Sequence, residues 1–304
     1  MTQVGQFWFC GNDITTLPIK TSRPSPAKLT TDHRLASTIS QLPTPLSISL
    51  TEFFTELYPY ITFHRLTDSA EIITRLFVMI TLSDLLRQFG QFPEKVRDAL
   101  TEKIERPTFS AWKNLLETAL KYLPKQKGQI KCFVSELPNF VQNRWLPALG
   151  SESDEPNKAI IALCNFIAHP ARLPNEQAQQ LLNAHKQPFE VLVKELEFLV
   201  NYDLVACAEE GQLVLLKGLP AFDGSFPDFD KTIPEAQPER VYLVKGKDAL
   251  DLFPLHAFTE ILQWREERYD FERIAETAPQ IYFRPSEKVY LEFVPFSKKQ
   301  PSAT

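Results

Sequence analysis

Residues 68–89 read DSAEIITRLFVMITLSDLLRQF, and this stretch decides the fold class of the first part of the chain. Its apolar residues recur at spacings of three and four, which is the period of an α-helix that buries one face. Asp68 followed by Glu71 matches a helix N-cap pair, so we predict a helix that begins near Asp68 and ends near Phe89. The stripe consists of Ile72, Ile73, Leu76, Phe77 and Ile80.

The same helical period recurs downstream, in segments bounded by prolines. One predicted helix begins at Pro93, and the next contains the apolar stripe from Trp112 to Leu123. Further helices are predicted over residues 133–145, 156–167 and 175–200. The last of them is expected to be the longest helix. A kink or break is expected in it at Pro188, because proline removes one helical N–H.

The period changes from helical to extended after Tyr202. Residues 204–208 and 213–219 flank one polar turn, residues 241–244 and 249–253 flank another, and each pair predicts an antiparallel hairpin. Short aromatic or β-branched runs follow at 261–264, 280–283 and 289–293. Because the helices precede the strands instead of alternating with them, the sequence predicts an α+β fold, a helical bundle followed by a small antiparallel β-rich unit of about five or six strands.

These patterns divide the chain into four segments. Residues 1–45 hold five prolines among many Ser and Thr and few apolar residues, so we expect an extended proline-rich arm there. The helical bundle is expected over residues 46–202, the β-rich unit over 203–296, and a polar tail over 297–304.

The composition of the 304 residues argues against several classes of protein. A net charge of -5 lacks the basic excess of a dedicated nucleic-acid binder, and the four cysteines are too scattered for a structural zinc site. Phosphate-binding loops depend on glycine, and the chain has 9 Gly against 24 Pro. With no recognisable signal peptide or membrane-spanning run, we expect a cytoplasmic protein with no membrane, metal or cofactor partner.

One polar pair stands out, because the common motifs of nucleotide-binding, serine hydrolase and zinc protease sites are absent from the sequence. It lies in IIALCNFIAHP, residues 160–170, where Asn165 and His169 are four residues apart and share one face near the end of a predicted helix. A structural role is open to this His, since it can bond the last carbonyls and interact with the helix dipole. The other interpretation is ligand binding or proton transfer.

This Asn-x-x-x-His arrangement, near the end of a late bundle helix, resembles the Arg-Asn-x-x-x-His signature of HEPN-type helical domains. In HEPN domains that cut RNA, the His moves the proton while a preceding Arg stabilises the phosphate charge. The resemblance implies that His169 would have the role of this His. Residues 162–164 are Ala, Leu and Cys, so the arginine of the ribonuclease motif is missing here. The resemblance thus implies a HEPN-like fold without its nuclease chemistry.

A wider resemblance covers residues 40–295 and rests on six fragments in a shared order. The fragments are Leu42–Pro45, Pro107–Trp112, Asn165 with His169, Phe198–Tyr202, Leu252–Leu255 and Ile281–Phe283. In this order they are similar to the N-terminal region of bacterial multidomain signalling and defence proteins, whose effector part is a STAND or AAA ATPase or a protein kinase. The resemblance implies a sensing or partner-binding role, with the effector on a separate polypeptide.

We therefore expect a non-enzymatic interaction or sensor protein of bacterial signalling or antiviral defence, with a separate ATPase, kinase or other effector as its protein partner. Two alternatives stay open. One is a HEPN-type ribonuclease or toxin that uses His169 with Arg144 or Arg172, and the other is an RNA-binding subunit that uses the aromatic sheet.

Aromatic residues outside the predicted helices and strands are the candidate partner-binding anchors, because aromatic side chains bury large areas at modest entropic cost. They are Phe7, Trp8 and Phe9 in the arm, and Phe222, Phe226 and Phe229 in the proline-rich loop. The alternative is that both segments fold back and complete the core of the protein itself.

Overall fold

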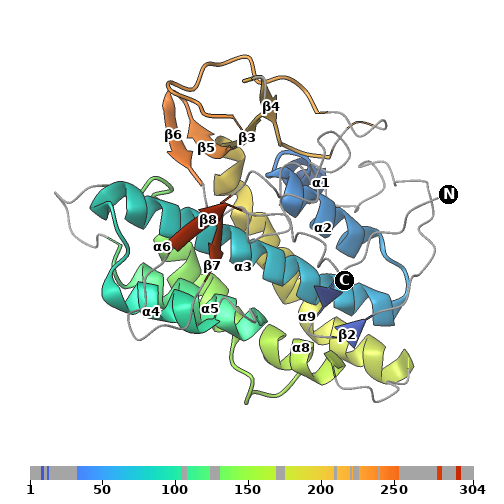
Figure 1. Cartoon of the computed structure of the whole chain (residues 1–304). Coiled ribbons are helices and arrows are strands. Elements are labelled where there is room, and N and C mark those ends of the chain that lie inside the picture. The colour runs from blue at the N-terminus through green and yellow to red at the C-terminus, as the bar shows by residue number, and fades with distance from the viewer. Residues whose placement is uncertain are drawn as a thin grey trace, which may run out of the picture.

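The computed structural model describes residues 33–103, 108–123, 131–168, 175–208, 211–219, 226–238 and 240–252, together with residue 221. It also describes the backbone of four short strands at residues 8–9, 12–13, 279–282 and 292–295. Helices form a bundle, and a four-stranded antiparallel sheet lies at one end of it (Figure 1). The predicted α+β class, helices first and a small β unit afterwards, is confirmed.

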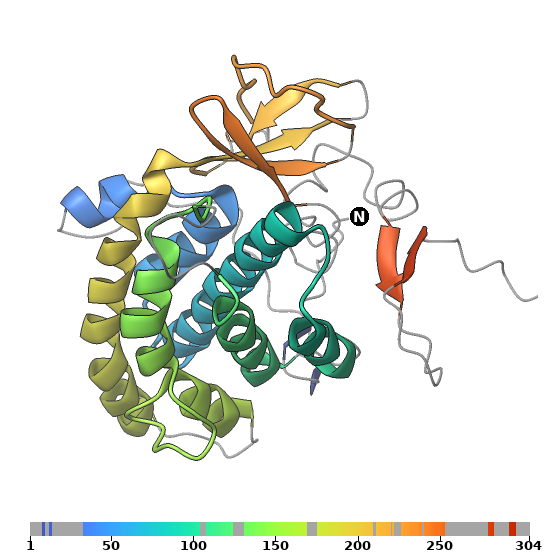
Figure 2. The same cartoon turned by 90° about the vertical axis from the view of Figure 1, so that its left-hand side faces the viewer.

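The longest helix among the described residues is α3, Pro59–Phe89, which crosses the middle of the bundle (Figure 1, Figure 2). Pro59 lies in its first turn, where backbone N–H groups make no hydrogen bond within the helix, so proline costs nothing there. Gly90 ends the helix with a left-handed φ of 69°. The predicted start at Asp68 is therefore wrong. The prediction of the longest helix is wrong as well, because α3 has 31 residues and α9, Asn175–Glu195, has 21.

Shorter helices surround α3. Those in direct contact with it are α2 (Thr44–Thr55), α5 (Phe109–Leu120), α8 (Ile160–Ala168) and α9, while α4 (Glu94–Lys103) packs on α5. The predicted stripe of α5 is buried, as Trp112 and Leu116 show. Helix α9 continues through Pro188 without a break and tightens into the 3-10 helix η3, Leu196–Asn201.

The helix predicted over residues 133–145 contains one wide turn. Helix α6 (Leu137–Phe140) leads into the π-helix η2 (Val141–Trp145) and then into α7 (Leu146–Leu149). Trp145 has no exposed surface, and its Nε1–H donates to Oγ1 of Thr74 on α3 at 3.0 Å. A single buried side chain thus joins the π turn to the central helix.

Part of the predicted arm is helical. Helix α1, His33–Ile39, lies within residues 1–45, and its Leu35 and Ile39 are fully buried. Burying these two side chains in the main core releases apolar surface from water, which an extended arm would leave exposed. The expectation of an extended arm therefore does not hold for residues 33–45. Before residue 33 the structure describes the two-residue strands β1 (Trp8–Phe9) and β2 (Asn12–Asp13).

Both predicted hairpins are present, and they join into one antiparallel sheet in the order β4-β3-β5-β6. The strands are β3 (Asp203–Cys207), β4 (Leu213–Leu215), β5 (Val241–Lys245) and β6 (Asp248–Asp251). Two later strands, β7 (Pro279–Tyr282) and β8 (Glu292–Pro295), pair with each other and not with this sheet. The sheet thus has four strands, fewer than expected. The run at 261–264 and the polar tail lie outside the described residues.

The sheet buries both of its faces, because alternate residues of each strand enter different cores. Leu204 and Leu243 belong to the main core shared with the bundle, whereas Val205 and Tyr242 belong to a second, smaller core. The second core is closed from outside by Phe229 and Ile233 of the segment 226–238. This segment also bonds to β4, since Leu215 N–H donates to Pro227 O and Phe229 N–H to Leu213 O, both at 2.9 Å.

Backbone hydrogen bonds join the first helices to the sheet. Thr44 N–H donates to Leu216 O at 3.0 Å, and Gly218 N–H donates to Leu42 O at 2.8 Å. Gly218 has a φ of 70°, and a Cβ there would lie 2.5 Å from the carbonyl oxygen of Ser40. Only glycine fits this close approach, so the joint depends on that position.

A second joint between bundle and sheet is polar. The Tyr202 hydroxyl donates to Oε2 of Glu136 at 3.0 Å and accepts from Lys245 Nζ at 2.9 Å. Burial disfavours the charged form of Glu136, but hydrogen bonds from its own backbone N–H, Ser135 and Tyr202 outweigh this effect and lower the pKa of Glu136. The network fixes β5 of the sheet to the residues that precede α6.

Candidate functional site

The Asn165/His169 pair is described only at its first residue. Asn165 lies on α8, half-buried, and α8 packs against α3. His169 lies outside the described residues, as does Arg172. The geometry of the pair therefore lies outside the described residues, and the roles of Asn165 and His169 stay as predictions.

Arg144, the other arginine considered for RNA cleavage, already has an anionic partner. It projects from η2, and its Nε and Nη2 donate to the two carboxylate oxygens of Glu195 at 2.8 and 2.6 Å. These hydrogen bonds and the attraction of Glu195 raise the pKa of Arg144. A guanidinium in such a bidentate pair would have to exchange a carboxylate for a phosphate before it could stabilise a transition state.

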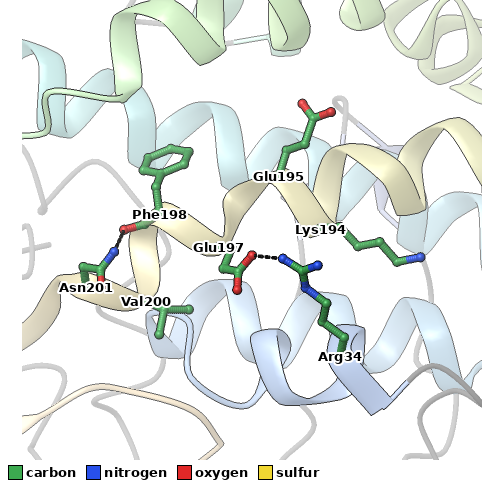
Figure 3. Close-up of a pocket in the computed structure, with 7 residues that line it drawn as sticks. All are labelled: Arg34, Lys194, Glu195, Glu197, Phe198, Val200 and Asn201. Carbon is green, nitrogen blue, oxygen red and sulfur yellow. Dashed lines mark hydrogen bonds and ion pairs between the residues drawn. The ribbon is translucent and has the colours of Figure 1, made fainter.

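An open hollow of about 810 Å³ lies where α9 tightens into η3. Its lining consists of Arg34, Lys194, Glu195, Glu197, Phe198, Val200 and Asn201. Figure 3 shows that Glu197 faces Arg34 of α1, whereas Glu195 and Phe198 point away from α1. Arg34 donates to Glu197 at 2.6 Å, so η3 is tied to α1 on one side and α9 is tied to η2 through Glu195 on the other.

The chemistry of this hollow suits a structural joint better than a ligand site. Lys194 pairs with Glu190 at 3.1 Å, and Asn201 donates to the carbonyl oxygen of Phe198 at 3.3 Å. The charged groups of the lining are therefore engaged with protein partners of opposite sign. A phosphate entering here would meet two carboxylates together with the cations, which removes most of the electrostatic gain.

Two of the predicted partner-binding anchors are buried. Phe226 is 7% exposed and belongs to the main core, and Phe229 is 9% exposed and belongs to the second core. These two rings complete the protein itself, as the alternative interpretation held, because the sheet would otherwise leave an apolar face in water. Phe7 and Phe222 lie outside the described residues, and of Trp8 and Phe9 only the backbone in β1 is described.

The sheet offers no open aromatic face within the described strands. Tyr242 is the aromatic residue of β5, and its ring is buried in the second core, where its hydroxyl accepts from Gln237 N–H at 2.8 Å. RNA-binding sheets stack bases on exposed aromatic rings. The four-stranded sheet β4-β3-β5-β6 has its two faces covered by the bundle and by the segment 226–238, so this sheet lacks such a platform.

The corner between α2 and α3 exposes three large apolar side chains, a feature that the sequence analysis missed. Leu57 is 88% exposed, Tyr58 is 70% exposed and Tyr60 is 45% exposed. We call these three residues the Leu57–Tyr60 ledge. Neighbouring apolar side chains at the surface indicate an interaction site, because covering them with a partner removes apolar surface from water.

The ledge is held in a fixed geometry. Oε1 of Glu56 accepts hydrogen bonds from Leu57 N–H at 2.8 Å and from Tyr58 N–H at 3.0 Å. Pro59 then fixes the backbone φ at the start of α3. The backbone that presents Leu57 and Tyr58 is thus ordered before any partner arrives.

Tyr60 is ordered through its ring as well as its backbone. Its ring meets His64 edge-on at 4.8 Å and the buried Phe63 at 5.6 Å, measured between ring centroids. Burial and the nearby Arg65 guanidinium lower the pKa of His64, which favours the neutral imidazole. The aromatic side of the ledge is therefore rigid and uncharged.

One sequence signal could have found the ledge. In Glu56-Leu57-Tyr58-Pro59-Tyr60, proline follows two apolar residues directly, and proline is typical of the first turn of a helix. Placing the start of α3 at Pro59 leaves Leu57 and Tyr58 in a connection between helices, and connections lie at the surface.

Within the described ranges, no group of three or more His, Cys, Asp or Glu side chains lies close enough to hold a metal ion. None of the helices that the structure describes combines the length and the apolar character needed to cross a bilayer.

The chain matches no protein-family model, no curated protein and no solved structure. The resemblance to HEPN-like modules accordingly stays a prediction.

Proposed function

We propose that this chain is a protein-interaction module that docks a separate effector protein, in bacterial signalling or antiviral defence. The observation that carries the proposal is the Leu57–Tyr60 ledge, an apolar surface on a pre-ordered corner of the bundle. The biological setting and the kind of effector, an ATPase or a kinase, rest on the sequence resemblance.

Physical chemistry favours the ledge as the centre of a contact. Tyrosine is enriched among the residues that dominate binding energies, because it combines a large apolar ring with a polar tip and few rotatable bonds. A surface that is already ordered loses less conformational entropy on binding than a flexible one. The fixed backbone at Leu57 and Tyr58 meets this condition.

The engagement of Arg144 by Glu195 supports an interaction role over RNA cleavage. A ribonuclease of the HEPN kind needs a cation placed against the phosphate together with its proton-transfer histidine. Arg144 is paired with Glu195 instead, and Arg172 lies outside the described residues.

The test compares the parent with the double variant Leu57→Ser, Tyr58→Ser. Proteins captured from the native host by the tagged parent are identified, one is purified, and its Kd for each variant is measured by calorimetry. We expect the double variant to weaken binding at least ~10-fold, the loss typical of removing central anchors, and to melt at the parent temperature because both side chains are exposed.

Phe89→Ser is the matched control. Phe89 is also an exposed apolar residue, 53% accessible, but it lies at the opposite end of α3. The control is expected to bind like the parent. If every purified partner binds the double variant with the parent Kd, the proposal is wrong.

A further inference from the structure

The size of the ledge limits what can bind there. An aromatic side chain buries about 150–250 Å² in a contact, so the three partly exposed side chains offer on the order of 400 Å². A stable interface between two folded proteins needs about 800 Å² from each partner. The ledge therefore fits a short segment better than a second copy of this chain.

The charges around the ledge are predominantly acidic. Helix α2 ends at Thr55 with no basic residue in its last turn, so its negative dipole end faces this corner. Within residues 52–65, Glu52 and Glu56 add two carboxylates against one guanidinium, that of Arg65, which pairs with Glu52 at 2.9 Å. Both backbone hydrogen bonds to Glu56 use Oε1, which leaves Oε2 to face other donors.

Aromatic rings beside carboxylates favour a cation. The face of a tyrosine ring attracts a guanidinium or an ammonium group, and a carboxylate nearby adds a direct ion pair. Tyr58 and Tyr60 supply the rings and Glu56 the carboxylate, while Leu57 supplies an apolar contact for a neighbouring side chain. From this combination, which rests on the proposed function, we infer that the ledge binds a short partner segment in which Arg or Lys adjoins an apolar residue.

A random peptide library displayed on phage tests this inference with a defined probe. The library is selected on the immobilised full-length parent and depleted on the double variant Leu57→Ser, Tyr58→Ser. An enriched peptide is then synthesised with a fluorescent label, and its Kd is measured by anisotropy. We expect enriched peptides to carry Arg or Lys next to an apolar residue.

Three variants separate the two kinds of contact for such a peptide. Tyr58→Ser should weaken binding ~10-fold or more because it removes the ring. Glu56→Gln keeps an oxygen for the two backbone N–H groups but removes the charge, so it should weaken binding about two- to fivefold, with a smaller salt dependence than the parent. Phe89→Ser should bind like the parent.

The outcomes distinguish this inference from the function on which it rests. Enriched peptides that depend on Tyr58 but lack basic residues, or that bind Glu56→Gln like the parent, would overturn the inference and leave an interaction role at the ledge intact. A selection in which no peptide survives depletion on the double variant would overturn the inference too. The proposed function itself fails only if the purified host partner also ignores the double variant.

Discussion

Replacing Thr74 by valine should destabilise the protein mainly through one buried hydrogen bond, the one that Trp145 donates; the hydroxyl also donates to Ala70 O at 2.8 Å, and this bond is lost as well. Thr74 and Trp145 have no exposed surface, and the indole Nε1–H donates to the threonine Oγ1 at 3.0 Å. Valine keeps the shape and β-branching of threonine but offers no acceptor. The indole N–H would then remain buried without a partner, in a site packed by Phe77, Phe140 and Phe189.

The expected cost follows from the two groups affected. A buried donor left unsatisfied costs about 1–3 kcal/mol, and the added methyl group of valine returns about 0.8 kcal/mol of apolar burial. We expect a net loss of about 0.2–2.2 kcal/mol in the free energy of unfolding. For a chain of this size the melting temperature should fall by up to roughly 9 °C.

A double-mutant cycle with Trp145→Phe identifies the cause. Phenylalanine has no N–H, so in that background Thr74→Val should cost less by about 1–3 kcal/mol. Urea unfolding followed by circular dichroism gives the four free energies. An equal cost of Thr74→Val in both backgrounds would show that the hydroxyl does not serve the indole, and the reasoning would be refuted.

Four further outcomes are expected. Leu116→Asp should abolish helical circular dichroism, because a charge buried without a partner costs several kcal/mol and the site has no exposed surface; parent-like melting would contradict the buried stripe of α5. Phe226→Ser with Phe229→Ser should lower the melting temperature, since both rings are buried, and unchanged melting would mean that they add nothing to the cores. Burial lowers the pKa of His185 despite its bond to Pro156 O, so the folded state holds fewer protons than the unfolded state. Stability should therefore be full above the unfolded pKa of 6.5 and fall as the pH drops below it, with a smaller slope in His185→Gln. The purified protein should release no fragments from labelled RNA, and cleavage that disappears in His169→Ala would contradict a non-enzymatic role.

The apolar stripes predicted most of the helices, yet the first turns of α3 escaped this pattern. Residues 59–67 bury Thr62 and Thr67 where a stripe would need apolar residues. Each hydroxyl donates to a carbonyl of its own helix, Thr62 to Tyr58 O at 2.9 Å and Thr67 to His64 O at 2.8 Å. A hydroxyl satisfied in this way can be buried at little cost, so two polar positions lie in the core here although the buried Phe63 and Leu66 keep the helical spacing.

The loop before β5 buries aromatic residues that no periodic pattern includes. No helix or strand pattern in the sequence includes Phe226 and Phe229, so the sequence makes them candidate partner anchors and leaves open that they complete the protein's own core. A sheet of four strands has a second face, and the segment 226–238 covers it with Phe229 and Ile233. Sequence periodicity describes how an element buries its own face, and it contains no information on which distant loop will cover the opposite face.

The same limit explains why the ledge was not predicted. An apolar residue next to a helix ordinarily packs on that helix, so Leu57 and Tyr58 give no local sign of exposure. Glu56 binds both of their backbone N–H groups, and this fixes a turn in which their side chains point outward while Phe53 and Phe63 on either side are buried. The bundle core is therefore complete without the ledge. Leu57 and Tyr58 can consequently be changed without affecting the fold, which makes them a direct test of whether this surface serves binding.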